Sequence, residues 1–483
     1  KEVRVKYLQH IQTMLELAGQ KNAKEKAWQI LALETELAKV QWAQVELRDP
    51  IKAYNKFELS KLAQLAPAFA WDEYLKETGV AGKADYVIVG QPSFIQGVGK
   101  LLEEQALAVW QAYLQWQVIT GSAELLSKKI DAESFAFRGK VLSGVTEQQP
   151  RWKRGVALTN GALGESVGKV YVAKYFPPER KAQMEKLVSN LLLAYKQSID
   201  QLDWMSAATK LEAQAKLAKF TPKIGYPNKW RNYSGLQVVR DDLFGNVRRS
   251  SEFEYDFSLN KLGKAIDRDE WGMTPQTVNA YYNPELNEIV FPASMLQPPF
   301  FDASADPAVN YGAIGAVIGH EISHGFDDEG SKYDGDGNLR NWWTEQDHKN
   351  FAAKTKMLVA QYSAFSPLPG YYVNGELSLG ENIADNSGLA IAYKAYKLSL
   401  GDKPAPVING MTGEQRFYLG FAQVWRGKMR DPRMIAMLKN GPHSPPEFRA
   451  NGTLRNQPGF YEAFGVKPGD KMYLPENQRV IIW

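Results

Sequence analysis

Apolar positions recur at helical spacing through most of the first 220 residues of the chain. The earliest such segment begins at the N-terminus, where Tyr7, Ile11 and Leu15 fall on one face of a helix. Stretches rich in Ala, Leu, Glu and Lys follow, separated by proline and glycine. They predict helices over residues 22–47, 101–120, 176–200 and 203–219.

The pattern changes beyond this helical half. Residues 222–271 are rich in turn-forming residues and are interpreted as a connection between two lobes. Thr277–Tyr282 and Ile289–Phe291 are predicted to be short strands on either side of a turn at Asn283-Pro284. We expect loops after residue 430, where Pro, Gly and Asn are frequent. Two further helices are predicted over residues 307–325 and 380–398, so the fold class is mainly α with a small β-sheet (α+β).

Composition narrows the chemistry that this chain can perform. The 483 residues include 58 Lys+Arg and 54 Asp+Glu, for a net charge of +4, so nucleic acid is a poor default partner. There is no Cys, which excludes thiolate metal sites, disulfides and a cysteine nucleophile. No apolar run is long enough to span a membrane. Metal or acid–base chemistry therefore depends on carboxylates and five His. His10 and His348 lie in polar helical contexts and are expected to be solvated.

The segment His320-Glu321-Ile322-Ser323-His324 has the spacing of a zinc site. On a helix, residues four apart share one face, so both imidazoles can bind one tetrahedral Zn²⁺. Glu321 is placed to take a proton from a zinc-bound water. The alternative is an ordinary helix that carries two His. The small apolar residues 312–319 suggest that this helix is buried against a sheet.

A second acidic pattern offers the third ligand. Glu381 and Asp385 are also four residues apart, at the start of the predicted helix over 380–398. Glu381 would complete a two-His, one-carboxylate site, and Asp385 would accept the second N–H of a ligand His. Both residues could instead simply favour the positive end of the helix dipole. The spacing alone leaves both interpretations open.

These motifs resemble those of the neprilysin and endothelin-converting-enzyme family of zinc endopeptidases, over nearly the whole chain. The matching segments are 320–328, 380–385, 279–282, 289–293, 297–301, 33–36 and the closing Trp483. The resemblance implies a two-lobed gluzincin-type metallopeptidase with a helical lid lobe and a thermolysin-like catalytic lobe. We place the lid lobe and connection at residues 1–255 and the zinc catalytic domain at residues 256–483. The absence of Cys favours a bacterial member.

The resemblance also implies roles for individual residues. His320, His324 and Glu381 match the zinc ligands, Glu321 the general base and Asp385 the residue that orients a ligand. His443, which is more often a surface residue in such a loop, matches the residue that stabilises the tetrahedral intermediate. Arg449 matches a residue that binds a substrate carbonyl. Asn279 and Ala280, at the end of a predicted strand, match residues that hold the substrate main chain. The apolar substrate pocket matches Met295, Phe300, Ala316, Val317, Val424 and Trp425; Ala316, smaller than the Met expected there, predicts a roomy pocket.

The expected function is therefore that of a zinc-dependent endopeptidase with one Zn²⁺ per chain. It would hydrolyse short peptides on the N-terminal side of hydrophobic residues, within a cavity between two lobes. The alternatives are a peptide-binding relative without activity, or an inactive fragment. The first residues already form a helix, so an N-terminal segment of the same protein is a further expected partner. An extracytoplasmic location, periplasmic or secreted, is favoured over the cytoplasm.

A second metal motif is set aside. Asp334-Gly335-Asp336-Gly337-Asn338 begins like a calcium-binding loop, but Leu339 stands where that loop requires a glycine. We interpret the segment as a turn.

Overall fold

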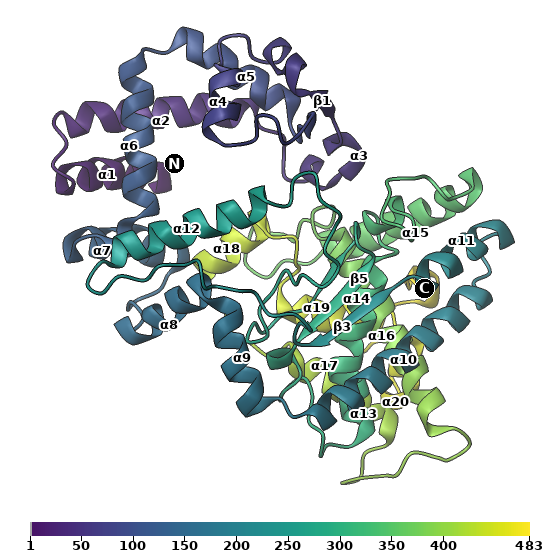
Figure 1. Ribbon diagram of the computed structural model, residues 1–483. Helices are drawn as coiled ribbons and strands as arrows, with labels where there is room; N and C mark the ends of the chain where they lie inside the picture. Colours follow the sequence, from purple (N-terminus) through teal and green to yellow (C-terminus); the bar gives the residue numbers. More distant parts are fainter. Residues whose placement is uncertain (1) are drawn as a thin grey trace. The chain divides into compact units, whose positions relative to one another are not determined.

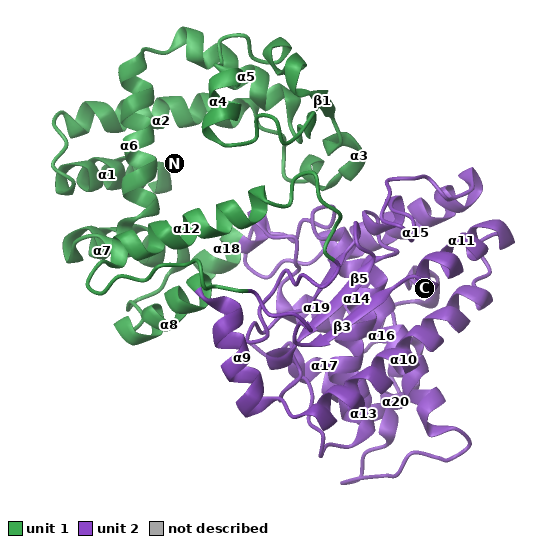
Figure 2. Ribbon diagram, viewed as in Figure 1, with its two compact units in different colours: residues 1–162, 232–267, 430–436 green, residues 163–231, 268–429, 437–483 purple. Residues whose placement is uncertain are grey.

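The computed structural model of the protein describes residues 2–483. Within these residues the protein is mainly helical, with two small β-sheets (Figure 1). It divides into two compact units, each assembled from several stretches of the chain (Figure 2). Unit 1 contains residues 1–162, 232–267 and 430–436, and unit 2 contains residues 163–231, 268–429 and 437–483.

Unit 1 consists of helices around a two-stranded antiparallel sheet. Its elements are α1 (Glu2–Leu17), α2 (Ala23–Val40), α3 (Pro50–Ala53), β1 (Lys56–Glu58), α4 (Trp71–Glu77), β2 (Tyr86–Ile88), α5 (Pro92–Glu104), α6 (Leu107–Gly121), α7 (Lys128–Ser134), α8 (Arg151–Ala162) and α12 (Leu243–Leu259).

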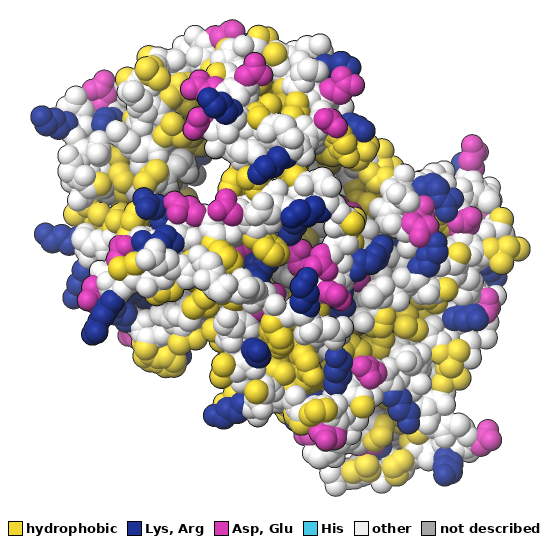
Figure 3. All heavy atoms as spheres, viewed as in Figure 1, with side chains coloured by type: hydrophobic (Ala, Val, Ile, Leu, Met, Phe, Trp, Pro, Cys, Tyr) yellow, Lys and Arg dark blue, Asp and Glu magenta, His cyan; other side chains and the backbone are white. Residues whose placement is uncertain are grey.

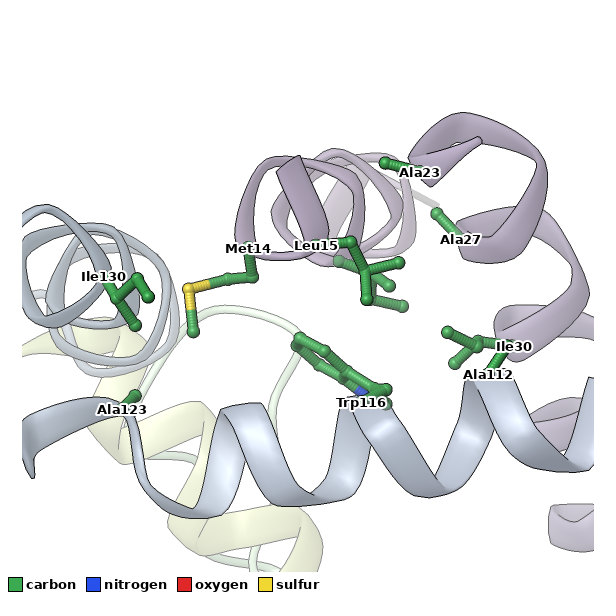
Figure 4. Close-up of a cluster of buried hydrophobic side chains, with 10 residues drawn as sticks. Met14, Leu15, Ala23, Ala27, Ile30, Ala112, Trp116, Ala123 and Ile130 are labelled. Carbon is green, nitrogen blue, oxygen red and sulfur yellow. The ribbon is translucent and has the colours of Figure 1, made fainter. Parts of the chain in front are cut away.

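The main core of unit 1 forms where α1, α2, α6 and α7 meet. Trp116 of α6 lies among Met14, Leu15 and Ile30, as Figure 4 shows. The apolar periodicity that predicted these helices therefore marks their buried faces. His10 also belongs to this interior. It is only 2% exposed, its ring stacks on Phe137, and the expectation that it is solvated is wrong.

Unit 2 packs its helices around a three-stranded sheet. Its elements are α9 (Gly164–Tyr175), α10 (Pro178–Gln201), α11 (Ala207–Ala218), β3 (Thr221–Gly225), β4 (Tyr281–Asn283), β5 (Glu288–Pro292), α13 (Pro307–Asn310), α14 (Ala316–His324), α15 (Glu345–Ser363), α16 (Leu379–Leu400), α17 (Gly413–Val424), α19 (Pro446–Leu454) and α20 (Pro458–Phe464). α18 (Asp431–Asn440) has residues in both units.

Local signals explain where several of these helices begin. Proline occupies the first turn of α10 and α19, where its missing N–H costs no hydrogen bond. The side chains of Ser206 and Thr344 cap α11 and α15. Thr412 and Gln415 form a reciprocal capping box at the start of α17.

The sheet of unit 2 has the order β3-β5-β4. β5 is buried along its whole length, pairs in parallel with β3 and pairs in antiparallel fashion with β4. The predicted hairpin is present, although its first strand begins only at Tyr281. Asn279 and Ala280 therefore precede β4 instead of ending a strand.

Three sequence-based expectations need correction or a different description. Residues 221–225 form β3, although residues 222–271 were interpreted as a connection; pairing with the distant β5 creates this strand. The chain after residue 430 contains α18, α19 and α20, because prolines there start helices as well as loops. The division into a lid lobe (residues 1–255) and a catalytic domain (residues 256–483) stays a prediction. The two compact units of the structure are a different division, because each unit combines segments that alternate along the chain.

The surface shows no strong segregation of charge on the face drawn in Figure 3, where Lys and Arg alternate with Asp and Glu. This mixture agrees with the small net charge of +4. Among residues 2–483, no helix is both long enough and apolar enough to cross a membrane.

Candidate metal centre and active site

The His320–His324 segment forms the end of α14. A π-helical segment, Tyr311–Gly315, leads directly into this helix. His320 and Glu321 are buried, and His324 is partly exposed. The four-residue spacing brings the two Nε2 atoms to 3.0 Å from each other.

Glu381, in the first turn of α16, meets these imidazoles. Its Oε2 lies 3.2 Å from Nε2 of His320 and 3.8 Å from Nε2 of His324. Within residues 2–483, this buried oxygen accepts no hydrogen bond of regular geometry. The three side chains each offer one ligand atom, and these atoms all lie within 4.8 Å of one another. They form a group able to bind one metal ion.

The hydrogen bonds behind the imidazoles fix which nitrogen faces the centre. Nδ1 of His320 is 2.8 Å from Oδ1 of Asp385, and Nδ1 of His324 is 2.7 Å from Oδ2 of Asp327. Because a carboxylate only accepts, each Nδ1 donates its N–H, and in the neutral ring, which is the form that binds a metal, the lone pair is then on Nε2. Two lone pairs 3.0 Å apart repel unless a cation lies between them. Tetrahedral Zn²⁺ at about 2.0–2.1 Å from each nitrogen would separate them by about 3.3 Å, so the donor set fits zinc.

Two glycines allow α14 and α16 to approach closely. A Cβ atom added to Gly319 would lie 2.9 Å from the carbonyl carbon of Gly388, and one added to Gly388 would lie 2.8 Å from Cα of His320. No side chain fits at this crossing, which brings Glu381 within reach of both His. The small residues before His320 therefore serve close packing against a helix. α14 also contacts strand β4, as the sequence led us to expect, although its more extensive contact is with α16.

The carboxylates around the imidazoles favour positive charge at the centre. Burial lowers the pKa of His320, but Asp385 and Glu381 outweigh it and raise that pKa to about 10. Burial opposes ionisation of Glu381, yet the neighbouring His side chains hold its pKa well below the usual range. A bound divalent cation would supply the positive charge that these carboxylates favour. Burial raises the pKa of Glu321, which brings it closer to the value that suits a general base.

Arg449 of α19 contributes to the centre through Asp385. Its Nε and Nη2 donate to the two oxygens of Asp385, each at 2.7 Å, and the guanidinium lies over the ring of Trp425 at 4.0 Å. This bidentate ion pair is almost completely buried. Arg449 therefore fixes the carboxylate that orients His320, in addition to lining the cavity.

His443 lies in the segment between α18 and α19. Its Nε2 is 3.2 Å from Oε1 of Glu381, the carboxylate oxygen that is farther from the imidazole pair. Its side chain is 45% exposed, so it borders the open part of the site. The neighbouring Ser444 is buried and donates to Asn382, which anchors this segment on α16.

All the residues predicted for the site line one cavity of about 480 Å³ within unit 2. The polar side of this cavity carries His320, Glu321, His324, Glu381, Asp385, His443 and Arg449, and its apolar part carries Met295, Phe300, Ala316, Val317, Val424 and Trp425. Asn279 and Ala280 border it just before β4, an edge strand of the sheet.

Sequence reasoning missed several residues of this cavity. Asp327 lies within the matching segment 320–328 and is given no role by sequence, yet it orients His324 as Asp385 orients His320. Its place three residues after a metal-ligand His was the available signal. Phe421 and Tyr281 also line the cavity, and nothing in their local sequence distinguishes them from core residues.

Comparison with known proteins identifies the family of this chain. The sequence profile of peptidase family M13 matches in two parts, its N-terminal part over residues 1–227 and its peptidase part over residues 279–480. The chain belongs to peptidase family M13. It is 34% identical to an endothelin-converting enzyme homolog of Locusta migratoria, over 96% of this chain and 67% of the relative. Human neprilysin is 35% identical over 94% of this chain and 63% of its own length.

Solved structures of M13 peptidases share the fold. Mycobacterium tuberculosis zinc metalloprotease Zmp1, in complex with an inhibitor, superposes with a TM-score of 0.96 at 47% identity, covering 100% of this chain and 74% of that one. PepO from Lactobacillus rhamnosis gives a TM-score of 0.92 at 30% identity, covering 100% and 75%. These matches confirm the predicted α+β metallopeptidase fold.

Two further facts follow from these comparisons. The chain spans about three fifths to two thirds of the length of the curated relatives it matches. Zn²⁺ is the cofactor of the zinc metallopeptidases in this family, and His320, His324 and Glu381 are the side chains here that can hold one such ion.

Proposed function

We propose that this chain forms the zinc-dependent catalytic part of an endopeptidase that hydrolyses short peptides on the N-terminal side of hydrophobic residues. The observation that carries the proposal is the convergence of two imidazoles and one carboxylate within 4.8 Å, beside the buried Glu321, in a cavity with an apolar side. This combination suits metal-assisted hydrolysis of an amide bond.

Each residue around the centre is assigned a separate role in hydrolysis. His320, His324 and Glu381 would hold Zn²⁺, which, when bound, supplies a Lewis acid for the substrate carbonyl and lowers the pKa of water. Glu321 is assigned the role of general base, since burial raises the pKa of its carboxyl while two neighbouring His offset part of that effect. His443, half exposed beside Glu381, is assigned to donate a hydrogen bond to the oxygen that gains negative charge.

The substrate is proposed to bind in an extended conformation. β4 is an edge strand, and an extended peptide can add its main chain to such an edge. Asn279 is exposed and Ala280 is buried at the start of this edge, both on the cavity wall. The apolar wall around Val317 and Trp425 would receive the hydrophobic side chain that follows the cleaved bond. Arg449, besides holding Asp385, would bind a substrate carbonyl.

The alternatives predict different behaviour. A peptide-binding relative without activity has no chemical need for a buried carboxylate beside the metal ligands, whereas Glu321 occupies that place. An inactive fragment would bind Zn²⁺ but require an additional segment of the same protein for hydrolysis. We propose that such an N-terminal segment is a partner of this chain and that the protein acts outside the cytoplasm.

The test is cleavage of a short quenched fluorescent peptide with Phe after the scissile bond. Zn²⁺-loaded protein should cleave it, a chelator should abolish cleavage, and re-added Zn²⁺ should restore it. Glu321→Gln should retain Zn²⁺ and lose at least about 10³-fold in kcat/KM. Full activity of Glu321→Gln would overturn the assignment of the base. Zn²⁺ binding without cleavage, in both proteins, would favour the inactive fragment.

A further inference from the structure

Lys216 is a buried lysine of α11 whose ammonium is bound only by backbone carbonyls. It is 1% exposed, and its Nζ donates to the carbonyl oxygens of Gly325, Gly330 and Tyr333 at 2.6, 2.7 and 2.8 Å. These three bonds use all three N–H donors of the ammonium. A lysine is rarely buried without a carboxylate partner, so this position requires an explanation.

The three carbonyls belong to one loop that follows the metal-binding helix. Gly325 ends α14 directly after His324, and Gly330 and Tyr333 begin and end the last turn of the loop. The ammonium therefore joins both ends of loop 325–333 to α11. A cation at the C-terminal end of a helix is also favoured by the partial negative charge of the terminal carbonyls.

Asp327 lies inside the loop that Lys216 holds. Its Oδ2 accepts from Nδ1 of His324 at 2.7 Å, and its Oδ1 accepts from the backbone N–H groups of Glu329 and Gly330 at 2.8 and 2.7 Å. Gly330 thus donates to Asp327 through its N–H and accepts from Lys216 through its carbonyl. The chain of contacts runs from Lys216 through a single residue, Gly330, to Asp327 and then to His324.

The surroundings of Lys216 are equally fixed. Asn287, which has φ 50° in the turn before β5, donates to the backbone carbonyls of Lys216 and Gly335. A Cβ atom added to Gly335 would lie 3.0 Å from Cα of Lys216. The backbone of Lys216 is therefore anchored by Asn287 and packed closely against Gly335, which fixes the point from which its side chain reaches the loop.

We propose that Lys216 is a positioning residue of the metal centre: its ammonium holds loop 325–333 in the shape that keeps Asp327 on His324. The inference rests on the proposed zinc site and adds a residue from α11 to it. Loss of an outer carboxylate contact typically weakens metal binding by about 10- to 100-fold, and loss of Lys216 should act through the same contact.

The experiment measures the Zn²⁺ affinity of the full chain by competition with a chromophoric chelator. Burial lowers the pKa of Lys216 to about 7, with Asp327 and Asp334 acting in the opposite direction, so the measurement is made below that value. Lys216→Met, which keeps the length of the side chain and removes its donors, should weaken binding by about 10- to 100-fold. Lys216→Gln, which retains two N–H donors, should lie between this variant and the wild type.

A double-mutant cycle separates positioning from general stability. If Lys216 acts through Asp327, then Lys216→Met combined with Asp327→Asn should bind Zn²⁺ within about two- to threefold of Asp327→Asn alone. Multiplicative losses would overturn the proposal. The spectrum of the Co²⁺-substituted protein should also change in Lys216→Met, since the coordination geometry changes with the orientation of His324.

The matched control is Asp347→Asn. The side chain of Asp347 accepts hydrogen bonds from Ser206 and Thr209 at the start of the same helix α11 and from Thr344, and these three residues lie outside loop 325–333. This variant should melt at a lower temperature yet bind Zn²⁺ like the wild type. If Lys216→Met does not fold, wild-type affinity in Lys216→Gln overturns the proposal. If the wild type itself binds no Zn²⁺, the proposed function fails instead.

Discussion

The close crossing of α14 and α16 predicts the effect of a substitution at Gly388. A Cβ atom at this position would lie 2.7 Å from the carbonyl carbon of Gly319 and 2.8 Å from Cα of His320, whereas ordinary contact begins at 3.4 Å. All of these neighbours are backbone atoms, so no side chain can rotate away. In Gly388→Ala the two helices must separate by at least about 0.7 Å.

This displacement has two consequences of different size. Overpacking against backbone costs about 3 kcal/mol, and the higher helix propensity of Ala returns about 1 kcal/mol, so the free energy of unfolding should fall by about 2 kcal/mol. The metal centre should be affected more, because metal–ligand distances fall within about 0.2 Å of their standard values, a range smaller than this displacement. We expect Gly388→Ala to lose at least about 100-fold in Zn²⁺ affinity, since Glu381 moves with α16 and both His move with α14.

Thermal unfolding and chelator competition measure these two effects on the same samples. Gly155→Ala is the matched control, because Gly155 lies within α8 and a Cβ atom there would meet nothing within 4 Å. It should be neutral or stabilising by up to about 1 kcal/mol and bind Zn²⁺ normally. Wild-type Zn²⁺ affinity in folded Gly388→Ala would refute the idea that this crossing sets the ligand geometry.

Three further predictions concern residues around the cavity and α11. Asp385→Asn should lower Zn²⁺ affinity by about 10- to 100-fold and, by leaving Arg449 without its carboxylate, reduce stability by about 3–5 kcal/mol; unchanged chelator competition would contradict this. Ala316→Met should lower kcat/KM at least about tenfold more for cleavage before Phe than before Ala, and equal losses would exclude a pocket role. Hydrogen bonds to the carboxylate outweigh burial and lower the pKa of Asp347 from 3.8 to about 2. Its contribution to stability, complete above the ordinary pKa, should therefore vanish as pH falls towards 2, and acid unfolding of Asp347→Asn should lack this component.

Local patterns in the sequence predicted many of the helices and the position of the site. Periodicity located α1 and α10 closely, because each of these helices buries one mainly apolar face. α16 was also located closely, although its residues 382–389 are buried on every side of the helix. Four-residue spacing placed His320 with His324 and Glu381 with Asp385, since residues four apart share a helix face whatever the rest of the chain does. The family resemblance then related the two helices to each other.

Contacts between distant segments explain what the sequence did not reveal. β3 exists because residues 221–225 pair with β5 far along the chain. His10 looked solvated on a polar helix, yet it is enclosed by Trp116 and Phe137. Lys216 has the local sequence of an exposed helical lysine, and only the loop after α14 makes it an interior residue. Such positions depend on tertiary partners, which no local pattern specifies.

The central claim is that one Zn²⁺ is held by side chains from two crossing helices. Native mass spectrometry of the full chain, loaded with Zn²⁺ and then freed of excess metal, tests this directly. The account predicts one Zn²⁺ per chain in the wild type and in Glu321→Gln, and none in Glu381→Ala. Retention of stoichiometric Zn²⁺ by Glu381→Ala, or its absence from the wild type, would contradict the account.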